Sequence, residues 1–160
     1  MAGNPKAQSM RAVIAAGAGG PEVLQEVERP ISAPGPEQLQ IRVRAIGINR
    51  ADALQRAGRY PPPPGISDIL GLELAGEVSA IGLGVTGFAP GDRVFGLVNS
   101  AAYAEYAVVD QGLAVRMPAG WEFPTAASVI ETFCTANETL FTLGGLAAGE
   151  TVHIHAGARG

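Results

Sequence analysis

Two histidines near the end of the chain could bind a metal. His153 and His155 lie two residues apart in "ETVHIHAGARG", and side chains two apart on a β-strand share one face. A structural zinc site needs four ligands and a catalytic one needs three from the protein, so two histidines are half a site. Histidines on strands also act as ordinary hydrogen-bonding groups. We therefore expect no metal at either residue.

A second possible site is the glycine pattern "GLGVTG" at residues 82–87. It matches G-x-G-x-x-G, the turn that holds the phosphates of a dinucleotide. That function requires a helix directly behind the third glycine, whose free N–H groups meet the anion. The residues that follow are "FAPGDRV", a turn and then a strand-like run. The pattern therefore predicts a turn between strands.

The last eleven residues are more typical of nucleotide binding. A polar start, the run from Val152 to His155, and then Gly157 and Gly160 indicate a buried strand that enters a glycine turn, as at the start of a dinucleotide-binding βαβ unit. Cys134 has no evident basic neighbour, so we interpret it as a small core residue rather than a nucleophile.

Composition limits the classes of protein to consider. The chain has 160 residues, of which 47% are hydrophobic and 16% charged, as expected for one soluble domain of ordinary core size. The net charge of −4 argues against a nucleic-acid partner, which requires a basic surface. No apolar stretch suits a secretory signal or a membrane span. A single cysteine fits a reducing compartment, so we expect a cytoplasmic protein.

The pattern along the chain predicts short strands first and helices later, which is an α+β fold class. Alternation of apolar and polar residues is clearest over residues 37–49, where the side chains expected on one face are Leu39, Ile41, Val43 and Ala45. A short helix follows over residues 49–58, and two helices that meet near Ile130 are expected over residues 123–146. The other strands are expected at residues 10–16, 23–30, 69–82, 92–98 and 101–110, with a final strand at 151–155.

Longer motifs resemble a known family. "GLELAGEVSAIGLGVTGFAPGDRVFG" resembles the signature of the medium-chain dehydrogenases/reductases, the zinc alcohol dehydrogenase superfamily. "INRADALQRAGRYPPPPG", "GGLAAGETVHIHAG" and "GGPEVL" are similar to its zinc-independent quinone oxidoreductase (zeta-crystallin-like) branch. The resemblance extends over nearly the whole chain from Met10. It implies a GroES-like partial β-barrel with a Rossmann domain inserted near its end.

The resemblance also implies a division of the chain. We expect a flexible leader at residues 1–9, a GroES-like substrate domain at 10–122 and linking helices at 123–149. Residues 150–160 would begin a truncated dinucleotide-binding domain and supply only its first strand.

The resemblance implies a site without metal. Zinc enzymes of the superfamily carry a histidine directly after the first glycine of the Gly71 motif, and here that position is Leu72. A leucine side chain cannot bind zinc. Glu73, next to it, is expected to be the buried partner of a cation rather than a ligand.

Five residues match family positions in the site. The resemblance implies catalytic roles for Asn49 and Tyr60, and cofactor-binding roles for Asn49, Thr135, Gly157 and Gly160. Three of them have structural alternatives. Asn49 also suits a helix cap, Tyr60 could pack on the proline run, and Thr135 could bond back to a carbonyl within its helix.

The function that the resemblance implies is NADPH-dependent hydride transfer to a quinone or an activated enone. The alternative is a non-catalytic, truncated GroES-like domain that self-associates or binds a partner, and we expect a homo-oligomer. Arg159 stands where the family usually has serine. We expect the 160 residues alone neither to bind NADPH tightly nor to reduce a quinone, because the phosphate-binding helix does not follow.

Overall fold

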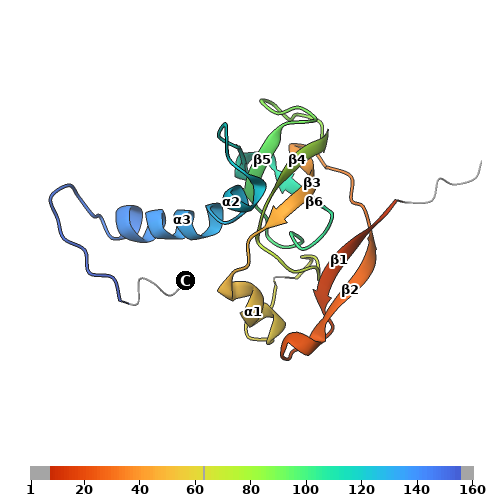
Figure 1. Ribbon diagram of the computed structural model, residues 1–160, viewed down its shortest axis with the longest axis horizontal. Coiled ribbons are helices and arrows are strands. Elements are labelled where there is room, and N and C mark those ends of the chain that lie inside the picture. The colour runs from red at the N-terminus through yellow and green to blue at the C-terminus, as the bar shows by residue number, and fades with distance from the viewer. Residues whose placement is uncertain (1–7, 63, 156–160) are drawn as a thin grey trace, which may run out of the picture.

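The computed structural model describes residues 8–62 and 64–155. It confirms the α+β fold class: a curled antiparallel sheet forms a half-barrel, with a β-hairpin beside it and few helices (Figure 1). The strands are β1 (Ser9–Ala15), β2 (Leu24–Pro30), β3 (Gln38–Ile46), β4 (Glu73–Ile81), β5 (Arg93–Leu97), β6 (Tyr106–Asp110) and β7 (Ala114–Arg116). The helices are α1 (Arg50–Arg56), α2 (Phe123–Ala127) and α3 (Ile130–Asn137), and a π-helical segment (Glu138–Leu143) continues α3.

The main sheet has the strand order β6-β3-β4-β5-β7, and every neighbouring pair is antiparallel. The pairing of β3 with β4 shifts register twice, between Gln40 and Ile41 and between Val43 and Ala45. Such irregularities bend a strand and increase its twist. The sheet therefore curls around its own apolar face.

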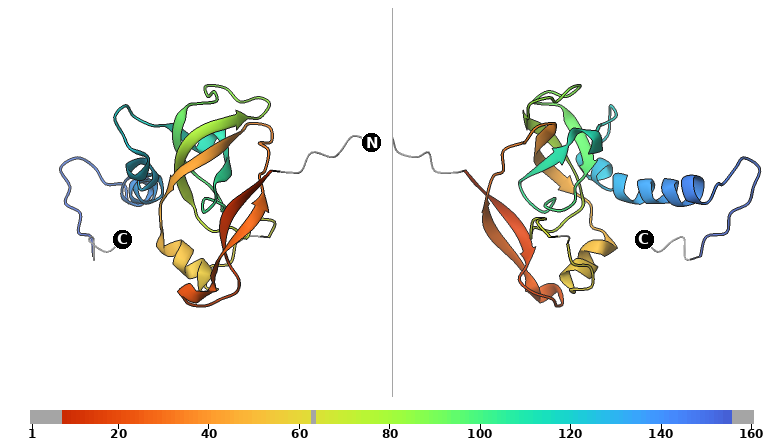
Figure 2. Two further views of the ribbon diagram at one scale, coloured as in Figure 1. Left: turned by 45° about the vertical axis from the view of Figure 1, so that its right-hand side comes forward. Right: turned by 180° about the vertical axis from the view of Figure 1, so that it is seen from behind.

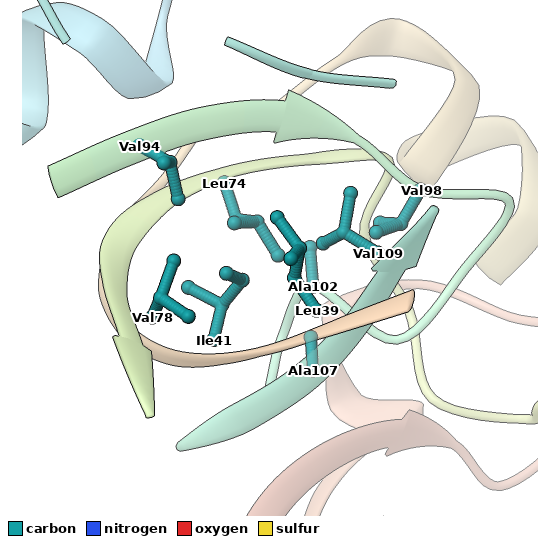
Figure 3. Packing of buried hydrophobic residues seen from close by; sticks show 9 residues of the cluster. All are labelled: Leu39, Ile41, Leu74, Val78, Val94, Val98, Ala102, Ala107 and Val109. Atoms are coloured by element: carbon teal, nitrogen blue, oxygen red, sulfur yellow. The ribbon is translucent and has the colours of Figure 1, made fainter. Parts of the chain in front are cut away.

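The alternation predicted for β3 fills the inside of this curl as far as Val43, whereas Ala45, predicted on the same face, lies beyond the second register shift and packs against the outer face of the sheet. Leu39 and Ile41 are fully buried, because residues two apart on a strand point to the same face. Figure 3 shows that the buried side chains of the curled sheet converge on one another. The residues of this inner cluster are Leu39, Ile41, Leu74, Val78, Val94, Val98, Ala102, Ala107 and Val109.

A second cluster attaches the helices to the outer face of the sheet. Ala126 and Ala127 of α2 are fully buried in a cluster with Ala75 of β4 and Phe95 of β5. The predicted break near Ile130 is confirmed, since α2 ends at Ala127 and α3 begins at Ile130. From there α3 extends away from the sheet, on the side opposite the β1–β2 hairpin (Figures 1 and 2).

The turn predicted for residues 82–87 is confirmed. These residues lie between the end of β4 and the start of β5, and no helix follows them there. An added Cβ at Gly82 would overlap the backbone carbonyl oxygen of Gly35, so this glycine allows two loops to approach closely. Among the helices that the structure describes, none is long and apolar enough to cross a bilayer.

One predicted element is not formed. Residues 151–154 have no strand structure and are exposed, so the prediction of a final strand at 151–155 is wrong for this structure. A strand exists only with a hydrogen-bonded neighbour, and no strand of the described ranges pairs with these residues. The three-residue strand β7 was not anticipated. The prediction that Cys134 is a small core residue is wrong, because it lies exposed on α3. The predictions for residues 1–7 and for Gly157, Arg159 and Gly160 lie outside the described residues.

Candidate active site

The register of the main sheet brings three segments together. Ile46 of β3 pairs with Leu74 of β4, so the residues that follow β3 lie beside the first residue of β4. The backbone N–H of Gly47 donates to the carbonyl oxygen of Glu73 at 3.4 Å. The start of α3 reaches the same place, because α2 packs on β3 and β4 immediately before it.

Glu73 occupies the centre of this junction and is only 2% exposed. Its Oε1 accepts a hydrogen bond from Nδ2 of Asn49 at 2.8 Å, and its Oε2 accepts one from the backbone N–H of Glu131 at 3.0 Å. No cation of the described residues forms an ion pair with it. The prediction that Glu73 is the partner of a cation is therefore wrong, since neutral donors satisfy its carboxylate.

Asn49 is the N-cap residue of α1, with an extended backbone at φ −112° and ψ 157°. The carboxylate of Asp52 accepts from its backbone N–H at 2.7 Å. The predicted position at the start of the helix is thus confirmed, and Gly58 ends the helix with a φ of +71°. The carboxamide of Asn49 also belongs to the capping box of α1, and its Nδ2 reaches out of the helix to Glu73.

Two hydrogen-bonded polar side chains, one buried and one half-buried, support the same helix. Asp52 is 4% exposed, and its Oδ2 also accepts from the hydroxyl of Tyr103 at 3.0 Å. Burial, and then the negative charge of Asp52, raise the pKa of Tyr103 far above its usual value. Tyr103 therefore stays a neutral donor, and α1 is connected to the segment before β6.

A cavity of about 480 Å³ opens next to this junction. Apolar side chains, Leu72 among them, form much of its wall, and Tyr60 and Glu131 add a hydroxyl and a carboxylate. Tyr60 is 55% exposed, so its ring remains accessible to a molecule in the cavity. The lining residues are Gln55, Tyr60, Pro62, Ile66, Leu72, Leu97, Val98, Asn99, Leu113 and Glu131.

Of the residues predicted for the site, Tyr60 lines the cavity, whereas Asn49 and Thr135 are not part of that lining. Both connect to Glu131, which does line it. Asn49 shares Glu73 with the backbone N–H of Glu131. The hydroxyl of Thr135 donates to the carbonyl oxygen of Glu131 at 2.8 Å. This is the hydrogen bond within the helix that was predicted as the alternative to a cofactor-binding role. Their catalytic and cofactor roles stay predictions.

The two histidines lie close together although their segment is not a strand. The ring centroids of His153 and His155 are 4.6 Å apart, and both residues are exposed. Within residues 8–62 and 64–155, no group of three or more potential ligands is arranged to hold a metal ion. The described part of the chain thus adds no third ligand to this pair.

Glu131 was not predicted from the sequence as a residue of the site. Burial, and then the nearby carboxylates of Glu73 and Asp52, raise its pKa above the ordinary value of 4.5. A carboxylate in the first turn of a helix is common and gives no local sign of a site. Only the folded chain shows that it faces a cavity with Tyr60.

We expect Glu131→Gln to raise the melting temperature at pH 7 and to leave it unchanged near pH 4. The folded state holds the Glu131 proton to a higher pH than the unfolded chain, so the stability of the unsubstituted protein falls as pH rises through this window. Glutamine does not titrate, so the stability of the Glu131→Gln variant does not fall for this reason as pH rises. Thermal melts of both proteins from pH 4 to 7 measure the difference. A constant difference across this range would contradict the expectation.

Comparison with known proteins identifies the family of this fold. The family model of the alcohol dehydrogenase GroES-like domain matches residues 35–119. The chain belongs to this family. A quinone oxidoreductase of Pseudomonas aeruginosa is 41% identical to this GroES-like chain over 143 residues, which are 89% of the chain and 44% of that protein. The pikromycin polyketide synthase component PikAII of Streptomyces venezuelae is 45% identical over 126 residues, 79% of the chain and 3% of that protein.

A solved structure agrees with these relatives. The Escherichia coli quinone oxidoreductase complexed with NADPH aligns with a TM-score of 0.75 and 36% identity, covering 84% of the GroES-like chain and 41% of that protein. The GroES-like chain is thus a member of the quinone oxidoreductase branch of the medium-chain dehydrogenases/reductases. It spans less than half the length of each of these relatives.

Proposed function

We propose that these residues form the substrate side of an NADPH-dependent quinone oxidoreductase that needs no metal. The observation that carries the proposal is the cavity beside Glu131, which has apolar walls and a small number of polar groups. This combination suits a flat, largely apolar molecule with carbonyl oxygens at its edge. Leu72 contributes to the wall at the position where zinc enzymes of the superfamily carry a histidine.

The chemistry proposed for the cavity is the reduction of a quinone or an activated enone. NADPH, when bound, supplies a hydride, and the developing oxyanion is stabilised by a hydrogen-bond donor and finally takes up a proton. Tyr60 is the donor that we assign to this oxygen. Asn49 and Thr135 are proposed on the cofactor side, together with Gly157 and Gly160, which lie outside the described residues.

The proposal keeps the division expected from the sequence. Residues 10–122 would bind the substrate, residues 123–149 would link, and residues 150–160 would begin the cofactor domain. It also keeps the cytoplasmic location, which the free and exposed thiol of Cys134 supports, because such thiols persist in reducing compartments.

Duroquinone tests the substrate class. Its ring is fully methylated, so the exposed thiol of Cys134 has no open ring carbon to attack. We expect duroquinone to shift the side-chain amide resonances of Gln55 and Asn99, which line the cavity, and to leave those of the exposed Asn137 in place. Absence of any saturable shift at Gln55 and Asn99 would refute the proposal.

Tyr60→Phe is expected to weaken duroquinone binding about two- to tenfold, because one hydrogen bond to a carbonyl is lost while the ring remains. The measurement is the same titration. Tyr106→Phe is the matched control, since Tyr106 packs with the β1–β2 hairpin and does not line this cavity. Equal affinities of the two variants would remove Tyr60 from the assigned role.

A second candidate function is self-association of a non-catalytic domain. The observation in its favour is a set of exposed apolar side chains that begins on α3, with Phe133 at 67% and Leu143 at 77% exposure. Exposed apolar groups of this size often mark an interface. A concentration-dependent mass in light scattering, without any duroquinone binding, would favour this candidate over the enzyme.

A further inference from the structure

Glu73 joins two segments that are distant in sequence. One carboxylate oxygen accepts from the side chain of Asn49, just before α1, and the other accepts from the backbone of Glu131, at the start of α3. A buried charge is costly in the absence of a cation and is tolerated where its acceptor capacity is used. The two bonds use both oxygens of Glu73.

A carboxylate also determines how its partners are oriented. It can only accept, so Asn49 must turn its Nδ2 toward Glu73 and its Oδ1 away. The N–H of Glu131 lies in the first turn of α3, where backbone donors have no partner within the helix. One side chain therefore fixes both the rotation of a carboxamide and the start of a helix.

The surroundings leave Glu73 little freedom to adopt another position. Gly47 lies against it, and an added Cβ there would overlap its Oε1 and lie 2.6 Å from the carbonyl oxygen of Ala127. The carboxylate thus fills a space bounded by the segment after β3 and by α2.

We propose that Glu73 is a positioning residue of the site: its carboxylate sets the orientation of Asn49 and holds the first turn of α3, so that Asn49, Glu131 and the cavity keep one arrangement. The link to substrate binding rests on the proposed function. The two hydrogen bonds themselves do not.

The test is Glu73→Gln in the same chain. Glutamine keeps the shape but replaces one acceptor oxygen with an NH₂ group, so one of the two donors loses its partner. We expect hydrogen exchange at the Asn49 side-chain amide or at the Glu131 backbone amide to become about tenfold faster. We also expect duroquinone affinity to fall about fivefold or more. Glu77→Gln is the matched control, because Glu77 lies on the same strand and pairs with Arg44 on the exposed surface.

The outcomes separate this inference from the proposed function. Faster exchange and weaker binding in Glu73→Gln, with Glu77→Gln unchanged, support it. Faster exchange with unchanged binding overturns the positioning role and leaves Glu73 a structural residue. If the unsubstituted chain does not bind duroquinone, the proposed function fails, but the exchange rates still decide whether Glu73 holds both partners. If Glu73→Gln does not fold, the inference is tested on the unsubstituted chain instead. In that chain, the Asn49 side-chain amide exchanging as fast as that of the exposed Asn137 would overturn the inference.

Discussion

Gly47→Ala is expected to lower the free energy of unfolding by about 3 kcal/mol, at the upper end of the cost of overpacking a buried site. The new Cβ would overlap the Glu73 carboxylate and approach the carbonyl oxygen of Ala127 to 2.6 Å. Backbone and a buried charge cannot both move away without breaking the hydrogen bonds of Glu73. Urea denaturation followed by tryptophan fluorescence of Trp121 gives the difference.

Gly112→Ala is the control for this substitution. Gly112 is exposed, and the nearest atom to an added Cβ is a carboxylate oxygen of Asp110 at 3.2 Å, which can rotate away. The expected change is below about 1 kcal/mol, because the backbone at this position accepts alanine. If Gly47→Ala were as mild as Gly112→Ala, the close packing around Glu73 would be disproved.

Leu39→Ala is expected to lower the free energy of unfolding by about 3 kcal/mol, as is usual for the cavity left by a fully buried leucine. Leu39 has no exposed surface and lies in the inner cluster of the curled sheet (Figure 3). Its strand pairs on both sides, with Ile81 of β4 and with Val109 of β6 beside it, so the surrounding backbone cannot collapse into the space. The measurement is the same denaturation experiment.

Leu83→Ala makes the same chemical change at a residue that is 85% exposed. Its expected effect is within about 0.5 kcal/mol. A loss at Leu83 that matched the loss at Leu39 would mean that the turn at residues 82–87, rather than the inner cluster, limits the stability of the fold.

Local patterns predicted the elements whose environment is set by nearby residues. The alternation through Leu39 and Ile41 indicated β3 and its buried face, and the helix after Asn49 had both a cap residue and a terminal glycine. The turn at residues 82–87 was also predictable, since the residues that follow it could not form a phosphate-binding helix.

The site depends on contacts that no local pattern contains. Glu73 was expected to meet a cation, but the register of Ile46 on Leu74 and the packing of α2 place an amide and a backbone N–H beside it instead. Residues 151–155 have the alternation of a strand, yet a strand also needs a neighbour, which a local pattern cannot supply. For the same reason Glu131 could not be recognised before α3 was placed.

The strand order of the main sheet has a consequence for synthesis on the ribosome. Strand β3 pairs with β6, so that Leu39 meets Val109, and the inner cluster cannot close until β6 has been made. At a synthesis rate of about 5–20 residues per second, the apolar face of β3 waits on the order of several seconds for that partner. During this interval the nascent chain presents an uncovered strand, which is the kind of segment that chaperones bind.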